Sequence, residues 1–185
     1  MKSAGIFLVN AIVLGLAFTV LPTGAFAQVN APNSNASPPA VSSSGLSLEE
    51  ARVIAAGAIA YANENKMRMG VVIVDTAGDV ITADRMDGSP YRNVHFAIGK
   101  AFASAIFNQT TEALGDIYKT RPDRYFGIQN MYPGKVYLVG GGVPLVLDGK
   151  MLGAVGVAGL PQGVDEKAGR AGIEALMAYR EKKKR

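Results

Sequence analysis

The sequence predicts a single α+β domain in which helices cover an antiparallel sheet. Two pairs of apolar runs are joined by short turns at residues 76–79 and 148–149, a pattern typical of antiparallel hairpins. Apolar stripes at helical spacing precede, separate and follow these pairs. A sheet of this kind buries its apolar faces where helices cover it. The pattern therefore predicts an α+β fold of about 140 residues, a usual size for one domain.

Three main helices are expected. The first begins at Ser47, which forms a capping box with Glu50. The second starts near Tyr91 and ends or bends at residues 107–111, and the third follows residues 162–165. The expected buried stripes are Ala51, Ile54, Ala55, Ala58, Ile59 and Ala62 in the first helix, Val94, Ile98, Ala101, Phe102, Ala105 and Ile106 in the second, and Ala168, Gly172, Ala175, Leu176 and Tyr179 in the third.

Five strands are expected. Residues 71–74 and 80–85 form the first hairpin, and residues 136–139 form a strand that ends at three consecutive glycines. Residues 143–147 and 151–157 form the second hairpin around an Asp-Gly turn, a sequence that suits the positive φ angles of such turns. The second hairpin is apolar on both faces, which predicts that both faces are covered.

Three glycines, Gly153, Gly156 and Gly159, interrupt the last expected strand. Glycine weakens a strand unless another group approaches its backbone closely. That group is either a packed helix or a flat ligand, and the sequence favours the helix slightly.

The segment between the second helix and the third strand is less regular. Residues 112–118 suggest a short helix that stops before Pro122, because the residue before a proline disfavours the helical conformation. Residues 123–134 show no clear period but contain Tyr125, Phe126, Ile128, Met131 and Tyr132. An irregular segment with this many aromatic and apolar residues is expected to cover another part of the protein or a ligand.

The N-terminus resembles an export signal. Lys2 precedes an apolar run at residues 6–21, and an Ala-Phe-Ala site at residues 25–27 suits signal peptidase. Residues 1–27 are therefore expected to be a signal peptide and residues 28–45 a disordered linker. The mature protein would be periplasmic or secreted, without a stable membrane span; a retained N-terminal anchor is the alternative.

Composition excludes several classes of site. The chain has no cysteine, so it has no disulfide, thiolate metal site or covalent c-type haem attachment. Of the 19 basic residues, Lys2 lies in the expected signal peptide and four end the chain, so 14 basic residues remain against 15 acidic ones. A nearly neutral body argues against nucleic-acid binding. The expected domain covers residues 46–180, and residues 181–185 form a solvated basic tail.

The remaining candidate residues each allow two interpretations. His95 is the only histidine; it is either a partly buried, hydrogen-bonded residue or a haem ligand or proton carrier. Thr110 or Thr111 is expected to cap the next short helix. Arg121, with Arg124 and Lys100, could bind carboxylates of a ligand or remain solvated. Tyr125, Met131 and Tyr132 suit either the wall of a flat apolar ligand or ordinary packing.

Several motifs together resemble one known family. The runs VIVDTAGD at residues 72–79 and RMDGSP at residues 85–90 are followed by GGGVPL at residues 140–145 and GAVGVAG at residues 153–159. This order is similar to the GlcG/HbpS-type family of haem-binding proteins, which includes the C-terminal domain of PduO adenosyltransferases. The resemblance extends from about residue 46 to residue 176.

The resemblance implies a profilin-like three-layer α/β/α fold with a five-stranded antiparallel sheet, and a homo-oligomer. It implies haem as the possible cofactor, bound reversibly and noncovalently. Thr111 matches the threonine that holds the iron in a haem-binding member, and His95 is the other candidate metal ligand. Arg121, Tyr125 and Met131 complete the expected haem-binding set.

The function expected from these observations is exported haem binding, for sequestration, sensing or slow haem degradation. Catalytic turnover is left open. The first alternative is a binding or enzymatic domain for a small organic acid or another flat cofactor, with Arg121, Arg124 and Lys100 as carboxylate anchors. The second alternative is an oligomeric accessory protein without a ligand of its own.

Overall fold

The computed structural model describes residues 45–161 and 163–185. The expected signal peptide, and all of the expected linker except Gly45, lie outside these residues. The described chain contains, in order, α1 (Leu48–Glu64), β1 (Gly70–Val74), β2 (Val80–Arg85), α2 (Arg92–Phe107), α3 (Thr111–Thr120), α4 (Pro122–Met131), β3 (Gly142–Leu147), β4 (Lys150–Ala158) and α5 (Val164–Lys183).

The sheet is antiparallel throughout, in the order β2-β1-β4-β3. Val72 of β1 lies opposite Ala83 of β2 and Gly156 of β4. Both expected hairpins are confirmed, and Asp148 and Gly149 have φ angles of 51° and 72° in the second turn.

The prediction of a five-stranded sheet is wrong for the described residues, which contain four strands. Residues 136–139 form an irregular segment instead of a strand. Its backbone groups bind helices: the Tyr137 N–H donates to the Gly99 carbonyl of α2, and the Val139 carbonyl accepts from the Thr111 hydroxyl of α3. Leu138 is buried in a cluster with Ala103 and Leu114. The apolar pattern of this segment therefore reflects packing between helices.

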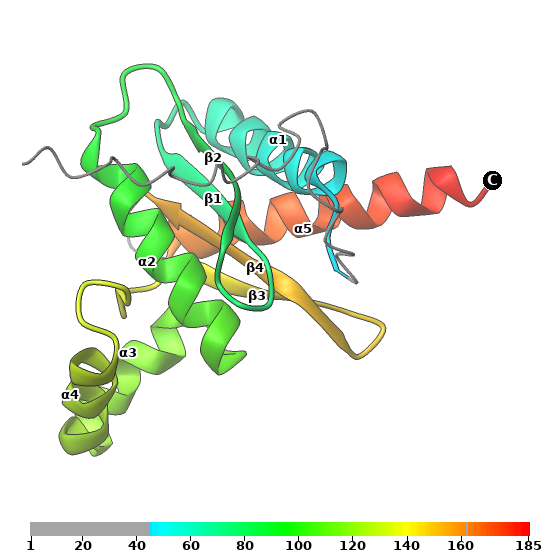
Figure 1. Ribbon diagram of the computed structural model, residues 1–185. Coiled ribbons are helices and arrows are strands. Elements are labelled where there is room, and N and C mark those ends of the chain that lie inside the picture. Colours follow the sequence, from blue (N-terminus) through cyan, green and yellow to red (C-terminus); the bar gives the residue numbers. More distant parts are fainter. Residues whose placement is uncertain (1–44, 162) are drawn as a thin grey trace, which may run out of the picture. The chain divides into compact units, whose positions relative to one another are not determined.

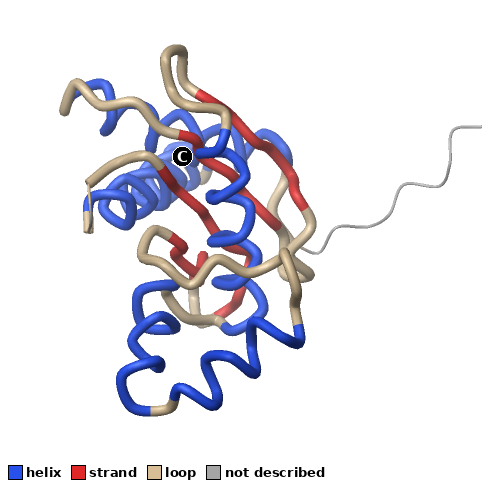
Figure 2. Tube along the Cα trace, turned by 90° about the vertical axis from the view of Figure 1, so that its left-hand side faces the viewer, coloured by secondary structure: helices blue, strands red, loops and turns tan. Residues whose placement is uncertain are grey.

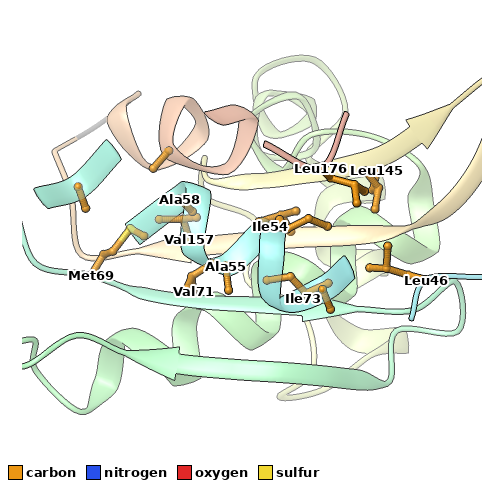
Figure 3. Close-up of a cluster of buried hydrophobic side chains, with 14 of the residues drawn as sticks. Leu46, Ile54, Ala55, Ala58, Met69, Val71, Ile73, Leu145, Val157 and Leu176 are labelled. Atoms are coloured by element: carbon orange, nitrogen blue, oxygen red, sulfur yellow. The ribbon is translucent and has the colours of Figure 1, made fainter. Parts of the chain in front are cut away.

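Helices cover both faces of the sheet (Figure 1). α1 and α5 lie on one face, where their apolar side chains pack against alternate residues of β1 and β4, among them Val71, Ile73 and Val157. Figure 3 shows Ile54, Ala55 and Ala58 of α1 above this surface. The capping box at Ser47 and Glu50 is present, and five of the six residues expected on the buried side of α1 are buried; Ile59 is partly buried.

The opposite face of the sheet is covered by α2. Val72, Val74 and Ala154 pack there against the small side chains of Ala97 and Ala101. A Cβ atom at Gly156 would collide with the backbone of α2. A packed helix, rather than a flat ligand, therefore accounts for this glycine.

The predicted stripe of α2 was only partly correct. Ala101 and Ala105 are buried, but Val94, Ile98, Phe102 and Ile106 are only half-buried. The helix instead buries residues on several sides, including Asn93, Lys100 and Ser104. The reason is that α2 contacts the sheet, α3 and the irregular segment at residues 136–139.

α3 and α4 form a pair of short helices that extends away from the sheet, beside the C-terminal end of α2 (Figures 1 and 2). Residues 123–131, expected to be irregular, belong to α4. Pro122 occupies the first turn of this helix, where its missing N–H costs nothing. Gly127 and the aromatic residues made the helical period of this segment difficult to recognise in the sequence.

α5 begins at Val164 and continues to Lys183, so the helix includes part of the expected basic tail. Arg180 of α5 pairs with Glu50 of α1 at 2.8 Å and ties the two helices together. Within the described part of the chain, no helix combines the length and apolar character needed to cross a membrane.

Candidate functional site

An apolar groove lies between the end of α2 and one side of α4. Its volume is about 440 Å³, within the range of small-molecule sites. Phe107 comes from α2, and Tyr132 follows α4. The other lining residues come from α4 and are Arg124, Gly127, Ile128 and Met131.

The lining residues of α4 form a single stripe. Arg124, Gly127, Ile128 and Met131 stand at positions i, i+3, i+4 and i+7, which share one side of a helix. Met131 is 73% exposed, and a Cβ at Gly127 would meet no atom within 4 Å. This side of α4 therefore presents an apolar surface. At Gly127 no side chain projects from it, and the Arg124 guanidinium lies at one end.

Aromatic contacts shape the rest of the groove. The Tyr132 ring packs edge-on against Phe107 and Phe102, with centroids 6.0 and 5.6 Å apart. These contacts hold Tyr132 against α2 and fix one wall of the groove.

A second cavity, of about 430 Å³, lies between α3, the glycine corner and the start of α5. Three of its lining residues are the carboxylates Glu112, Asp116 and Asp165. Asp116 is paired with Lys119 at 2.6 Å. We call this space the acid-lined cavity; its charge disfavours an anionic ligand.

Asp165, which lines the acid-lined cavity, forms a buried ion pair with Lys100. The Lys100 Nζ lies 2.6 Å from Asp165 Oδ2 and also donates to the Val157 carbonyl at 2.9 Å. The Leu160 N–H donates to Asp165 Oδ1. Burial raises the pKa of Asp165 above its usual value, although the hydrogen bond and charge of Lys100 oppose that rise. The pair links α2, β4 and α5.

Thr111, the expected iron ligand, is fully buried at the start of α3. Its hydroxyl donates to the Val139 carbonyl and accepts from the Gly142 N–H, both at 2.7 Å. The helix cap is Thr110, whose side chain accepts from the Ala113 N–H. The capping prediction is confirmed for Thr110, and Thr111 holds the glycine corner against α3.

His95 lies on the first turns of α2 and is exposed, so the expectation of a partly buried histidine was wrong. Its ring contacts Tyr91 edge-on at 6.2 Å. Phe107 of the groove is twelve residues further along the same helix, about 18 Å away at 1.5 Å per residue. His95 therefore does not reach the groove within one copy of the chain.

The other expected site residues lie on different surfaces of the protein. Met131 lines the groove. Arg121 is exposed and forms a two-point ion pair with Asp123, at 3.1 and 2.9 Å. Tyr125 packs edge-on against Tyr118 of α3, on another side of α4. The cations of the organic-acid alternative do not converge, because Lys100 is buried with Asp165 while Arg121 pairs with Asp123.

Comparison with known proteins places this geometry in a family. The family model described as "Haem degrading protein HbpS-like" matches residues 46–174. The chain belongs to the HbpS-like family. The match covers nearly the whole described domain.

Individual relatives agree with this family. A double mutant of Streptomyces reticuli HbpS has a similar structure, with a TM-score of 0.66 and 29% identity, over 79% of this chain and 97% of that one. The PduOC–haem complex gives a TM-score of 0.65 and 26% identity, over 71% and 94% of the two chains. An uncharacterized 15.0 kDa protein from the dhaT-dhaS intergenic region of Citrobacter freundii is 29% identical over 62% of this chain and 80% of that protein.

Sequence reasoning missed most of the groove of this HbpS-like protein. Phe107, Gly127 and Ile128 were not in the predicted site, and Arg124 was considered only as one of three scattered cations. The i, i+3, i+4, i+7 spacing within residues 124–131 was the signal that could have identified them. It was overlooked because this segment was expected to be irregular.

Proposed function

We propose that this protein binds haem reversibly and noncovalently in the apolar groove between α2 and α4. The observation that carries the proposal is the lining of the groove, which is apolar except for one cation, Arg124, and the Tyr132 hydroxyl. Such a surface suits a flat apolar molecule with carboxylates at its edge. Haem has this chemistry, and the related PduOC chain forms a haem complex.

Charge favours the groove over the acid-lined cavity. Haem carries two propionates. In the acid-lined cavity Asp116 and Asp165 are paired with lysines, but Glu112 has no ion-pair partner among the described residues and would repel a propionate. The groove has no carboxylate among its lining residues. The two spaces have nearly equal volumes, so lining chemistry, not size, decides between them.

The groove residues fit the needs of a bound haem. Phe107 and Ile128 would contact its apolar faces, and the thioether of Met131 is of a ligand type that haem iron accepts. When bound, haem would supply an iron centre capable of redox chemistry. Thr111 and His95 stay predictions as ligands; in this conformation the Thr111 hydroxyl is engaged by the chain itself.

The biological setting is part of the proposal. The apolar N-terminal segment supports export to the periplasm or the outside of the cell. The groove is open and the chain has no cysteine for thioether attachment of haem. Reversible binding of this kind suits haem sequestration, sensing or slow degradation. We also propose a homo-oligomer, as the sequence resemblance implies.

Filling the groove tests its role. In Gly127→Leu the new side chain has open space at its Cβ, and leucine favours a helix more than glycine does. We expect thermal stability at or above that of the wild type, and haem affinity reduced by about tenfold or more. Titration with haem, followed by its Soret absorbance, measures the affinity.

The matched control is Gln129→Leu, which adds the same side chain to an exposed position of α4 outside the groove. This control should bind haem like the wild type. Wild-type affinity in a folded Gly127→Leu variant would exclude the groove, and an absence of Soret change in the wild type would exclude haem binding.

A further inference from the structure

The groove carries a charge at one end only. Arg124 and Met131 terminate the lining stripe of α4 and are seven residues apart, about 10 Å along the helix axis. Gly127 and Ile128 lie between them. A flat ligand in the groove therefore meets a cation at the Arg124 end and a thioether at the Met131 end.

The Arg124 side chain is available to a ligand. Asp123, the only carboxylate of α4, already accepts two hydrogen bonds from Arg121. The hydrogen bonds from Arg121 hold the pKa of Asp123 below its usual value, so this carboxylate stays ionised and paired. Among residues 45–161 and 163–185, no carboxylate forms an ion pair with Arg124.

We propose that Arg124 is the specificity-determining residue of the groove and that it selects ligands bearing a carboxylate at one edge. This inference rests on the proposed haem site and names the residue that would hold a propionate, Arg124, at the end of the groove opposite Met131. The planar guanidinium binds a carboxylate through two parallel hydrogen bonds. Arg124 is exposed at the end of the groove, and a ligand lying in the groove would itself exclude water from this contact.

Comparing haem with its dimethyl ester distinguishes the carboxylate contact at Arg124 from the affinity for the haem ring itself. Haem and haem dimethyl ester have the same flat ring, but the ester has no carboxylate charge. For the wild type, we expect haem to bind about tenfold more tightly than the ester. Arg124→Gln should lose about tenfold for haem and remain within about twofold for the ester. Arg124→Lys should recover part of the haem affinity, because it restores the charge without the two-point geometry.

Arg170→Gln is the matched control, because it removes the same charge from an arginine that pairs with Glu166 within α5 and does not line the groove. It should leave both affinities unchanged. Equal losses for haem and ester in Arg124→Gln, or a loss in Arg170→Gln as large as that in Arg124→Gln, would overturn the inference.

Failure of this inference differs from failure of the proposed function. If the wild type binds haem and its ester equally and Arg124→Gln changes neither affinity, the selectivity proposal is wrong while haem binding stands. If the wild type binds neither ligand, both proposals are wrong.

Discussion

Replacing Lys100 by methionine is expected to destabilise the domain by about 3–5 kcal/mol, because it leaves the buried Asp165 carboxylate without its partner. The two side chains are 4% and 10% exposed, and their charged atoms are 2.6 Å apart. Methionine keeps most of the apolar stem of the lysine side chain but donates no hydrogen bond to Asp165 or Val157. Chemical denaturation, with the linear extrapolation of the free energy of unfolding, measures the effect.

The control for this change is Lys119→Met. Lys119 and Asp116 are also 2.6 Å apart, but their side chains are 72% and 58% exposed. Because exposed pairs contribute about 0–1 kcal/mol, this variant should remain close to the wild type. Similar losses in the two variants would contradict the assignment of a structural role to the buried pair.

The Lys100→Met variant should also gain stability as the pH falls. Burial already raises the pKa of Asp165, and loss of the opposing lysine raises it further. A carboxyl whose pKa is higher in the folded state binds its proton more tightly there, so the free energy of unfolding increases as the pH falls through the folded-state pKa. Asp165→Asn in the Lys100→Met background should recover part of the lost stability and weaken this pH dependence.

Replacing Thr111 by valine is expected to cost about 2–4 kcal/mol, because it leaves two buried backbone groups without a partner. The hydroxyl joins the Val139 carbonyl and the Gly142 N–H, and valine has nearly the same shape. Thr111→Ser retains the hydroxyl and should lose less. Thr110→Val removes the helix cap and should cost about 1 kcal/mol.

Thr111→Val also tests the role of Thr111 in haem binding. If the hydroxyl serves the fold, the folded fraction of Thr111→Val should bind haem with the wild-type affinity and spectrum. A stable Thr111→Val protein with an altered Soret band would instead make Thr111 an iron ligand, as the family resemblance implies.

The sequence predicted the locally determined parts of the fold well. The Ser47 capping box and the Asp-Gly turn depend on residues within a few positions of each other, and both are present. Residues 136–139 were misassigned because a short apolar run looks the same in a strand and in a segment packed between helices. Its actual partners, Gly99 and Thr111, are far away in the sequence.

The site was less predictable for the same reason. The Lys100–Asp165 pair joins residues 65 positions apart, and no local pattern indicates it. Met131 was chosen correctly as a lining residue, but Tyr125 faces α3 because one residue turns a helix by about 100°. His95 and the groove lie at opposite ends of α2, a separation that becomes visible only when the helix is known to be continuous.

The most direct test of the account is to locate the haem iron by NMR. Ferric haem is paramagnetic and broadens signals close to the iron, so methyl-labelled methionine reports its position. With haem in the groove, we expect the Met131 methyl signal to broaden or shift, while Met177, exposed on α5 across the sheet from α2, keeps its signal. The amides of Gly140 and Gly163 in the acid-lined cavity should also remain unchanged. Broadening at Gly140 and Gly163 with an unaffected Met131 would contradict the account and place haem in the acid-lined cavity.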